Sequence, residues 1–122
     1  NTLEFYYSRA GHPNTLLQRN NASIMELNGK GSFLGMFEGL EFEENMIQLN
    51  KGDRLFFYTD GITEAKGPNG EMFGESRLHD VITKMQIQPI GSTLHQLFDD
   101  VDLYTQYQKA TDDRSLVILE LN

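Results

Sequence analysis

The fold of this 122-residue chain is decided by residues 54–61, Arg-Leu-Phe-Phe-Tyr-Thr-Asp-Gly. Large side chains occupy both odd and even positions, so we expect a strand that is covered on both faces, as in the interior of a layered sandwich. Asp60 follows this strand, and Gly61 allows the sharp turn that comes next. The segment therefore predicts a central strand that holds a carboxylate at a rigid edge of a sheet.

Weaker strand patterns surround this segment. Further strands are expected at residues 3–7, 15–19, 23–27, 41–49 and 116–121. Asn20-Asn21 tolerates positive φ and suits a hairpin between two of them, and residues 50–53, Asn-Lys-Gly-Asp, suit a tight turn. Residues 10–14, 29–39 and 66–74 are rich in Gly, Pro and Asn, so we expect turns and irregular loops there.

Two amphipathic helices are expected after the central strand. The first begins near residue 75, and the second is expected to begin at Ser92, a residue type that caps helices well. Their apolar residues recur with the spacing that one buried helix face requires. These residues are Leu78, Val81, Ile82 and Met85 in the first helix, and Leu94, Leu97, Phe98 and Val101 in the second.

The composition excludes several classes of protein. Ten basic and eighteen acidic residues leave a net charge of −8, so we expect no nucleic-acid partner, because phosphates require a basic surface. The absence of Cys excludes disulfides, cysteine-ligated metals and a cysteine nucleophile. The longest apolar runs have four residues, against about twenty for a membrane helix, so we expect no membrane span. A chain of this length should form one domain, residues 1–122.

Acidic residues flank two of the predicted strands. Asp60 ends the central strand, and Asp112 and Asp113 precede the last strand. If these strands are antiparallel neighbours, their carboxylates converge at one edge of the sheet. Without Cys, the cation preferred there is Mg²⁺ or Mn²⁺, and two such ions can activate a water for attack on phosphorus. The same spacing also fits solvated turns, so spacing alone leaves both interpretations open.

Other polar residues receive weaker assignments. Lys66 and Arg77 could steer a phosphate, although an arginine on an amphipathic helix ordinarily lies on its solvated face. Glu64 could support the acidic edge, although a surface helix-forming role is the safer interpretation. The remaining candidates are assigned no site, and they are His12, His79, His95, Asp99, Asp100 and Asp102.

The motifs around the acidic residues resemble one family. Residues 58–65, Tyr-Thr-Asp-Gly-Ile-Thr-Glu-Ala, and residues 68–74, Pro-Asn-Gly-Glu-Met-Phe-Gly, resemble the bacterial stage II sporulation protein E-like phosphatases. These belong to the metal-dependent, type 2C-like (PPM) Ser/Thr protein phosphatases. Further matches in family order are residues 10–13, Gly35 in a Leu-Gly-Met stretch, residues 51–55 and residues 111–115. The resemblance runs from about Leu3 to Leu121.

The resemblance implies an α+β fold, a β-sandwich of two mostly antiparallel sheets flanked by helices. It places two Mn²⁺ or Mg²⁺ ions at one edge, with Asp60 and Asp112 as metal ligands and Gly61 and Asp113 in supporting positions around them. No side chain would act as nucleophile, because a metal-bound water would hydrolyse phosphoserine or phosphothreonine. The implied substrate is a phosphorylated bacterial regulator of the anti-sigma-factor-antagonist type. A sensor or receiver domain would precede this region in the same polypeptide, and the protein would be cytoplasmic.

The chain also departs from the family pattern. Thr111 stands where an Asp is usual, and Arg114 where an aliphatic residue is usual. The acidic strand motif and the Gly-Asp and Gly-His-Gly motifs of the family's amino-terminal half do not occur, so residues 1–122 correspond to its carboxy-terminal part. Two carboxylates alone cannot organise two ions, and the chain by itself is expected to be inactive. The alternatives are an inactive phosphatase-fold module that binds a signalling partner, with Arg114 replacing a metal, and a purely structural sandwich.

Overall fold

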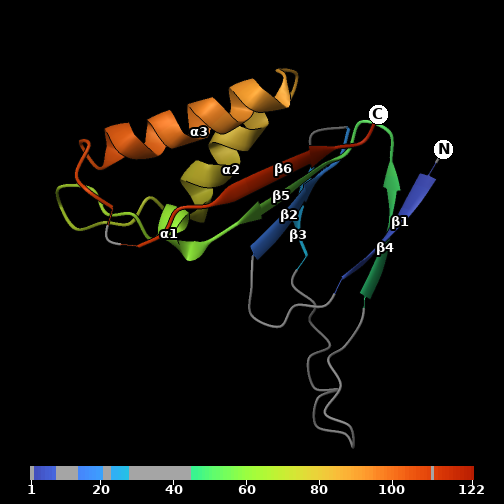
Figure 1. The fold of residues 1–122 in the computed structure, drawn as a ribbon, viewed down its shortest axis with the longest axis horizontal. Coiled ribbons are helices and arrows are strands. Elements are labelled where there is room, and N and C mark those ends of the chain that lie inside the picture. Colours follow the sequence, from blue (N-terminus) through green and yellow to red (C-terminus); the bar gives the residue numbers. More distant parts are fainter. Residues whose placement is uncertain (1, 8–13, 21–22, 28–44, 111) are drawn as a thin grey trace, which may run out of the picture.

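The structure is a computed structural model that describes residues 2–7, 14–20, 23–27, 45–110 and 112–122. Two β-sheets pack face to face, and two long helices cover the outer face of the larger sheet (Figure 1). The described elements are β1 (Thr2–Tyr7), β2 (Asn14–Gln18), β3 (Ile24–Glu26), β4 (Asn45–Asn50), β5 (Arg54–Tyr58), α1 (Asp60–Thr63), α2 (Gly74–Lys84), α3 (Ile90–Tyr104) and β6 (Leu116–Glu120). The predicted α+β sandwich is confirmed.

All described strand pairs are antiparallel. The larger sheet has the order β3-β2-β5-β6, and β1 pairs with β4 in a second sheet. The central position predicted for residues 54–59 is therefore confirmed for β5. In its register with β6, Tyr58 lies opposite Leu116 and Arg54 opposite Glu120. The end of β5 consequently meets the beginning of β6, which is the arrangement on which convergence of the acidic motifs depends.

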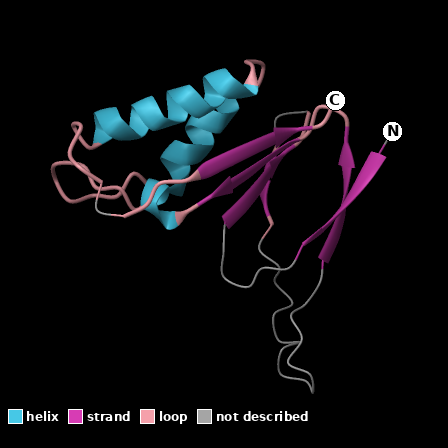
Figure 2. Cartoon of the chain, in the orientation of Figure 1, coloured by secondary structure: helices cyan, strands magenta, loops and turns pink. Residues whose placement is uncertain are grey.

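Two apolar cores explain why β5 has large residues on both faces. Phe56 and Tyr58 belong to the core between the larger sheet and the helices, together with Leu16 of β2. Leu55 and the adjacent Leu17 belong to the core between the two sheets. Each strand sends alternate side chains to opposite faces, so one short segment contributes to both layers. Figure 2 shows these layers as helix, sheet and sheet.

The expected helices are present, but the start of the second was predicted wrongly. α2 buries Leu78, Val81 and Ile82 as expected. α3 begins at Ile90 with Pro89 as its N-cap, and Ser92 lies inside the first turn. The ring of Pro89 fixes an extended approach to the helix, and its carbonyl accepts the N–H of Ser92 at 3.0 Å. The Pro-Ile sequence, rather than the serine hydroxyl, therefore sets the start of α3.

A buried arginine joins the helical layer to the larger sheet. The Arg54 side chain donates from Nε to Glu120 Oε2 at 3.1 Å, and from Nη1 to Met85 O and Thr93 Oγ1 at 3.3 Å each. It also donates from Nη2 to the carbonyl of Gln88. A buried charge requires such partners, because an unpaired one would carry a large desolvation cost. Arg54 thus fixes the connection between α2 and α3 against β5 and β6.

The tight turn expected at residues 50–53 is confirmed. Asp53 N donates to Asn50 O at 3.0 Å, and Gly52 has a φ of +91°, a conformation that glycine adopts without steric cost. The buried Asp53 carboxylate accepts from Asn50 N at 2.8 Å and from Arg19 Nη1 at 2.6 Å. The turn between β4 and β5 is therefore fixed to β2 as well.

Some expected segments cannot be compared with the structure. The turn at residues 10–13, the irregular segment at 29–39 and residues 41–44 of an expected strand lie outside the described residues. The expected loop after Lys66 is present, with a single bridge between Lys66 and Met72. Within the described ranges, no helix is both long and apolar enough to cross a membrane.

The apolar face of α3 provides a test of the core between the helices and the larger sheet. Leu97 is 0% exposed and Leu103, on the same helix, is 64% exposed. We expect Leu97→Ala to lower the free energy of unfolding by about 2–5 kcal/mol, because it leaves a cavity in the core. Leu103→Ala is the matched control and should change it by less than about 0.5 kcal/mol. Urea unfolding measures both, and equal values would contradict the assigned packing.

Candidate functional site

The end of β5 is attached to the start of β6 through Thr59. Thr59 N donates to Ser115 O at 3.2 Å. Its hydroxyl donates to Asp113 O at 3.1 Å and accepts from Ser115 N at 3.0 Å. Thr59 occupies the N-cap position of α1, yet its side chain makes no capping bond there. Its hydrogen bonds instead fix the Thr-Asp-Gly motif to the residues that precede the last strand.

Gly61 makes the closest backbone approach in this region. A Cβ atom at this position would lie 1.8 Å from Asp113 O and 2.7 Å from Asp113 C. Real Cβ contacts do not occur at such distances, so any other residue would force the two segments apart. Gly61 lies within α1 and does not have a positive φ, so the requirement for glycine after Asp60 comes from its contact with residue 113 and not from the turn.

Asp60 opens α1 and is exposed, and a residue from β2 orients its carboxylate. Asn14 Nδ2 donates to Asp60 Oδ1 at 2.7 Å. Asn14 lies opposite Tyr58 in the register of β2 and β5, so the sheet brings these side chains together. Asn14 was expected in a turn, and this role was not predicted. No local signal in the sequence indicated it, because the contact depends on the register of β2 with β5.

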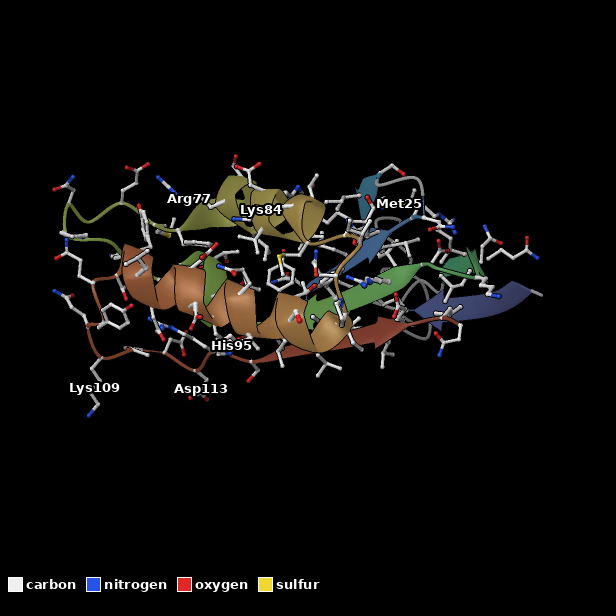
Figure 3. The ribbon with its side chains drawn as sticks, turned by 90° about the horizontal axis from the view of Figure 1, so that it is seen from above. Met25, Arg77, Lys84, His95, Lys109 and Asp113 are labelled. Atoms are coloured by element: carbon white, nitrogen blue, oxygen red, sulfur yellow. The ribbon has the colours of Figure 1, made fainter. Side chains whose placement is uncertain are left out.

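Asp112 and Asp113 lie next to the same edge and are both exposed. Asp112 Oδ1 accepts from Asp113 N at 2.8 Å, which fixes one of its oxygens. The Asp113 side chain points outward from the molecule, on the side where Lys109 also extends (Figure 3). Thr111, the departure from the family pattern, lies outside the described residues.

The structure brings the backbones of the two acidic motifs into contact, at one end of β5. Oxygen ligands of this kind suit Mg²⁺ or Mn²⁺. Among the described residues, however, no three His, Cys, Asp or Glu side chains are grouped closely enough to hold an ion. The donor set fits part of a metal site, as expected for two carboxylates alone, and the assignment of Asp60, Asp112, Gly61 and Asp113 stays a prediction.

Arg77 and Arg114 have partners that the sequence did not indicate. Arg77 does not simply project into solvent, because Nη1 donates to Met72 O at 3.0 Å and Phe73 O at 2.9 Å. Its guanidinium also lies 4.4 Å above the centre of the Tyr104 ring, a cation–π geometry. Arg114 Nη1 pairs with Asp102 Oδ1 of α3 at 3.0 Å. Both side chains therefore hold neighbouring segments in place.

A cavity of about 600 Å³ opens beside the acidic edge. Gly61 and Asp112 contribute to its wall, so it adjoins the candidate metal site. Its other charged lining residues are Glu64, Lys66, Lys109 and Arg114. The site as a whole thus combines exposed carboxylates at a sheet edge with a neighbouring cavity whose walls carry more cations than anions.

Solved structures define the class of fold. The chain matches the SiaA-PP2C domain of Pseudomonas aeruginosa with a TM-score of 0.73 and 19% identity, over 91% of this chain and 44% of that one. It matches the phosphatase domain of SpoIIE from Bacillus subtilis, presoaked in Mn, with a TM-score of 0.68 and 17% identity, over 99% of this chain and 51% of that one. The fold is that of PP2C phosphatase domains, of which the chain covers about half.

The sequence comparison identifies the family. The family model of stage II sporulation protein E (SpoIIE) matches residues 1–122, and the chain belongs to this family. It is 31% identical over 77 residues to protein IcfG of Synechocystis sp., covering 63% of this chain and 12% of that protein. It is 26% identical over 117 residues to the phosphoserine phosphatase RsbU of Bacillus subtilis, covering 95% of this chain and 34% of that protein. The chain thus spans about a third of the length of RsbU and a smaller share of IcfG.

Gly61 provides a test of the edge geometry. We expect Gly61→Ala to destabilise the protein by at least about 1–3 kcal/mol, because the added methyl group overlaps the Asp113 carbonyl. Gly91→Ala is the matched control, since nothing lies within 4 Å of its Cβ position. This second exchange, at a helical position, should be neutral or stabilising by up to about 1 kcal/mol. Thermal and urea unfolding compare the two, and a Gly61→Ala variant as stable as Gly91→Ala would contradict the close approach.

Proposed function

We propose that residues 1–122 form the carboxy-terminal part of a single phosphatase domain that hydrolyses phosphoserine or phosphothreonine in a regulatory protein. The observation that carries this proposal is the contact of Thr59 and Gly61 with Asp113 and Ser115, which sets the two acidic motifs at one edge. Membership of the SpoIIE family supports it. RsbU, a relative over nearly the whole chain, is a phosphoserine phosphatase by name.

In this proposal Asp60 and Asp112 bind two Mn²⁺ or Mg²⁺ ions together with ligands from outside residues 1–122. When bound, the ions would supply Lewis acidity and a water of lowered pKa for attack on the phosphoryl group. Asn14 would hold the Asp60 carboxylate in its ligand orientation, and Asp113 would orient Asp112 through its backbone N–H. Outer contacts of this kind fix the direction of ligand oxygens before an ion arrives.

The resemblance to the family also suggests a wider setting for this activity. The substrate would be a phosphorylated regulator of the anti-sigma-factor-antagonist type, and a sensor or receiver domain in the same polypeptide would control its hydrolysis in the cytoplasm. Manganese is supported by the Mn-presoaked SpoIIE phosphatase domain that shares this fold. Because the chain carries a net charge of −8, bound cations would be needed to attract a phosphorylated substrate to its acidic edge.

Asp60 is the residue whose substitution tests the proposal. In the full-length protein, Asp60→Asn should lower Mn²⁺-dependent hydrolysis of an aryl phosphate by at least about 100-fold, the upper end of losses seen for residues around metal ligands. Excess chelator should abolish turnover, and added Mn²⁺ should restore it. Asp99→Asn is the matched control, because this exposed carboxylate pairs with His95 on α3 and should leave the rate unchanged.

The alternative function makes the opposite prediction for the same assay. An inactive module that binds a signalling partner would show no Mn²⁺-dependent turnover in the full-length protein, and Asp60→Asn would then change nothing. Arg114 was the residue suggested to replace a metal in that case. Its guanidinium pairs with Asp102 on α3, and this contact is no evidence that it occupies a metal position.

Asn14 gives an independent test through metal affinity. Asn14→Ala removes the amide that holds Asp60, so Mn²⁺ should bind about 10- to 100-fold more weakly to the full-length protein. Calorimetric titration with Mn²⁺ measures this without any turnover. Unfolding of the metal-free variant provides the control, because a purely structural role would appear as lost stability with unchanged affinity. That result would contradict the orienting role.

A further inference from the structure

The cavity beside the acidic edge has three walls, two from residues 61–72 and one from the segment after α3. α1 and the residues just after it form one wall, and Met72 forms the second. The third is formed by Thr105, Gln108, Lys109, Asp112 and Arg114. Gly61 and Asp112 lie within its lining. A ligand group in the cavity would therefore be adjacent to a phosphoryl group held at the candidate metal site.

The charge of the cavity is opposite in sign to that of the chain. The chain carries ten basic and eighteen acidic residues, yet the cavity is lined by three cations, Lys66, Lys109 and Arg114, and two anions, Glu64 and Asp112. If Asp112 binds a metal ion, as the proposed function states, its charge is neutralised. Arg114 is already paired with Asp102, so Lys66 and Lys109 are then opposed by Glu64 alone. The cavity then favours an anionic ligand.

The loop wall of the cavity is held by Tyr104 and Arg77. The Tyr104 hydroxyl donates to Glu71 O at 3.0 Å, and Gly67 N donates to the same carbonyl at 2.9 Å. Arg77 covers the Tyr104 ring and donates to Met72 O. Met72 therefore lines a wall that is tied to both long helices and does not need to form when a ligand arrives.

The opposite wall is fixed by the way α3 ends. Gln106 and Tyr107 have φ values of +57° and +62°, a left-handed conformation that is costly for residues with a side chain. It is maintained by hydrogen bonds from Gln106 N to Leu103 O at 3.0 Å and from Tyr107 N to Asp102 O at 2.7 Å. The chain thereby reverses after α3, which places Lys109 at the cavity with its side chain extending outward at the rim (Figure 3).

We propose that this cavity binds acidic residues next to the phosphorylated side chain of the protein substrate. Lys66 and Lys109 would pair with carboxylates of the substrate, and Arg114, paired with Asp102, would form a fixed part of the wall. This inference rests on the proposed function for the position of the phosphate. Because the wall at Met72 and the wall after α3 are already held by contacts within the protein, binding an extended acidic segment requires little ordering of these walls.

The test compares two phosphoserine peptides in the full-length protein with Mn²⁺, one flanked by Asp and Glu and the other by Ser and Ala. The double variant Lys66→Ala, Lys109→Ala should raise KM for the acidic peptide about 4- to 25-fold, since an exposed charge pair contributes about two- to fivefold. We expect kcat, KM for the neutral peptide and aryl phosphate hydrolysis to remain within about twofold. The acidic-peptide effect should shrink in high salt.

The matched control is Lys51→Ala, Lys84→Ala, which also removes two exposed lysines. Lys51 lies in the turn before β5, and Lys84 lies on α2, on the other side of the molecule from Lys109 (Figure 3). This variant should not discriminate between the peptides. An unchanged KM for the acidic peptide in the cavity variant, or an equal rise for both peptides, would overturn the proposal while leaving the phosphatase function intact.

A binding measurement separates failure of this inference from failure of the proposed function. Fluorescence anisotropy of a labelled acidic peptide in the presence of Mn²⁺ requires no hydrolysis. Weaker binding by the cavity variant, with normal binding by the control, supports the cavity even in a protein without turnover. Equal binding by wild type, cavity variant and control would overturn it.

Discussion

The absence of a side chain at Gly61 is the constraint on which the candidate site depends. The carbonyl of Asp113 occupies the space that any Cβ would need, and Thr59 bonds to the same carbonyl from the end of β5. A single contact thus sets the direction in which Asp60 leaves β5 and the path by which residues 112–115 enter β6. The acidic edge consequently depends on the antiparallel pairing of β5 with β6 and on the absence of a Cβ atom at position 61.

The rest of the scaffold keeps this edge at a fixed position relative to the helices. Arg54, at the start of β5, bonds to β6 and to the connection between α2 and α3. At the other end of the same strand, Thr59 bonds to the segment before β6. β5 is therefore anchored at both ends by polar contacts, while Phe56 and Leu55 between them fill the two apolar cores. The fixed position of β5 therefore also fixes the position of Asp60 and Gly61, which follow it.

Local patterns predicted the elements well because their causes are local. Large residues on both faces of residues 54–59 indicated a central strand, and apolar spacing indicated α2. The start of α3 was wrong because a serine was favoured over Pro89, whose ring restricts the backbone more strongly than a hydroxyl attracts it. Two contacts could not be predicted in this way. The Asn14 bond to Asp60 depends on the register of β2 with β5, and the cation–π contact of Arg77 joins it to Tyr104 on another helix. Neither local patterns nor strand register shows that Asp60 and Asp112 bind metal, since the other ligands that two ions would need are not among the described residues.

The position of β6 has a consequence for handling the protein. Among the described strands, β6 lies at one edge of the four-stranded sheet. Val117 and Leu119 on it are 54% and 48% exposed, although their register partners Phe57 and Leu55 face the core between the sheets. An edge strand with apolar side chains offers a ready template for pairing with another chain. In isolation, residues 1–122 should therefore be prone to self-association through β6 at high concentration.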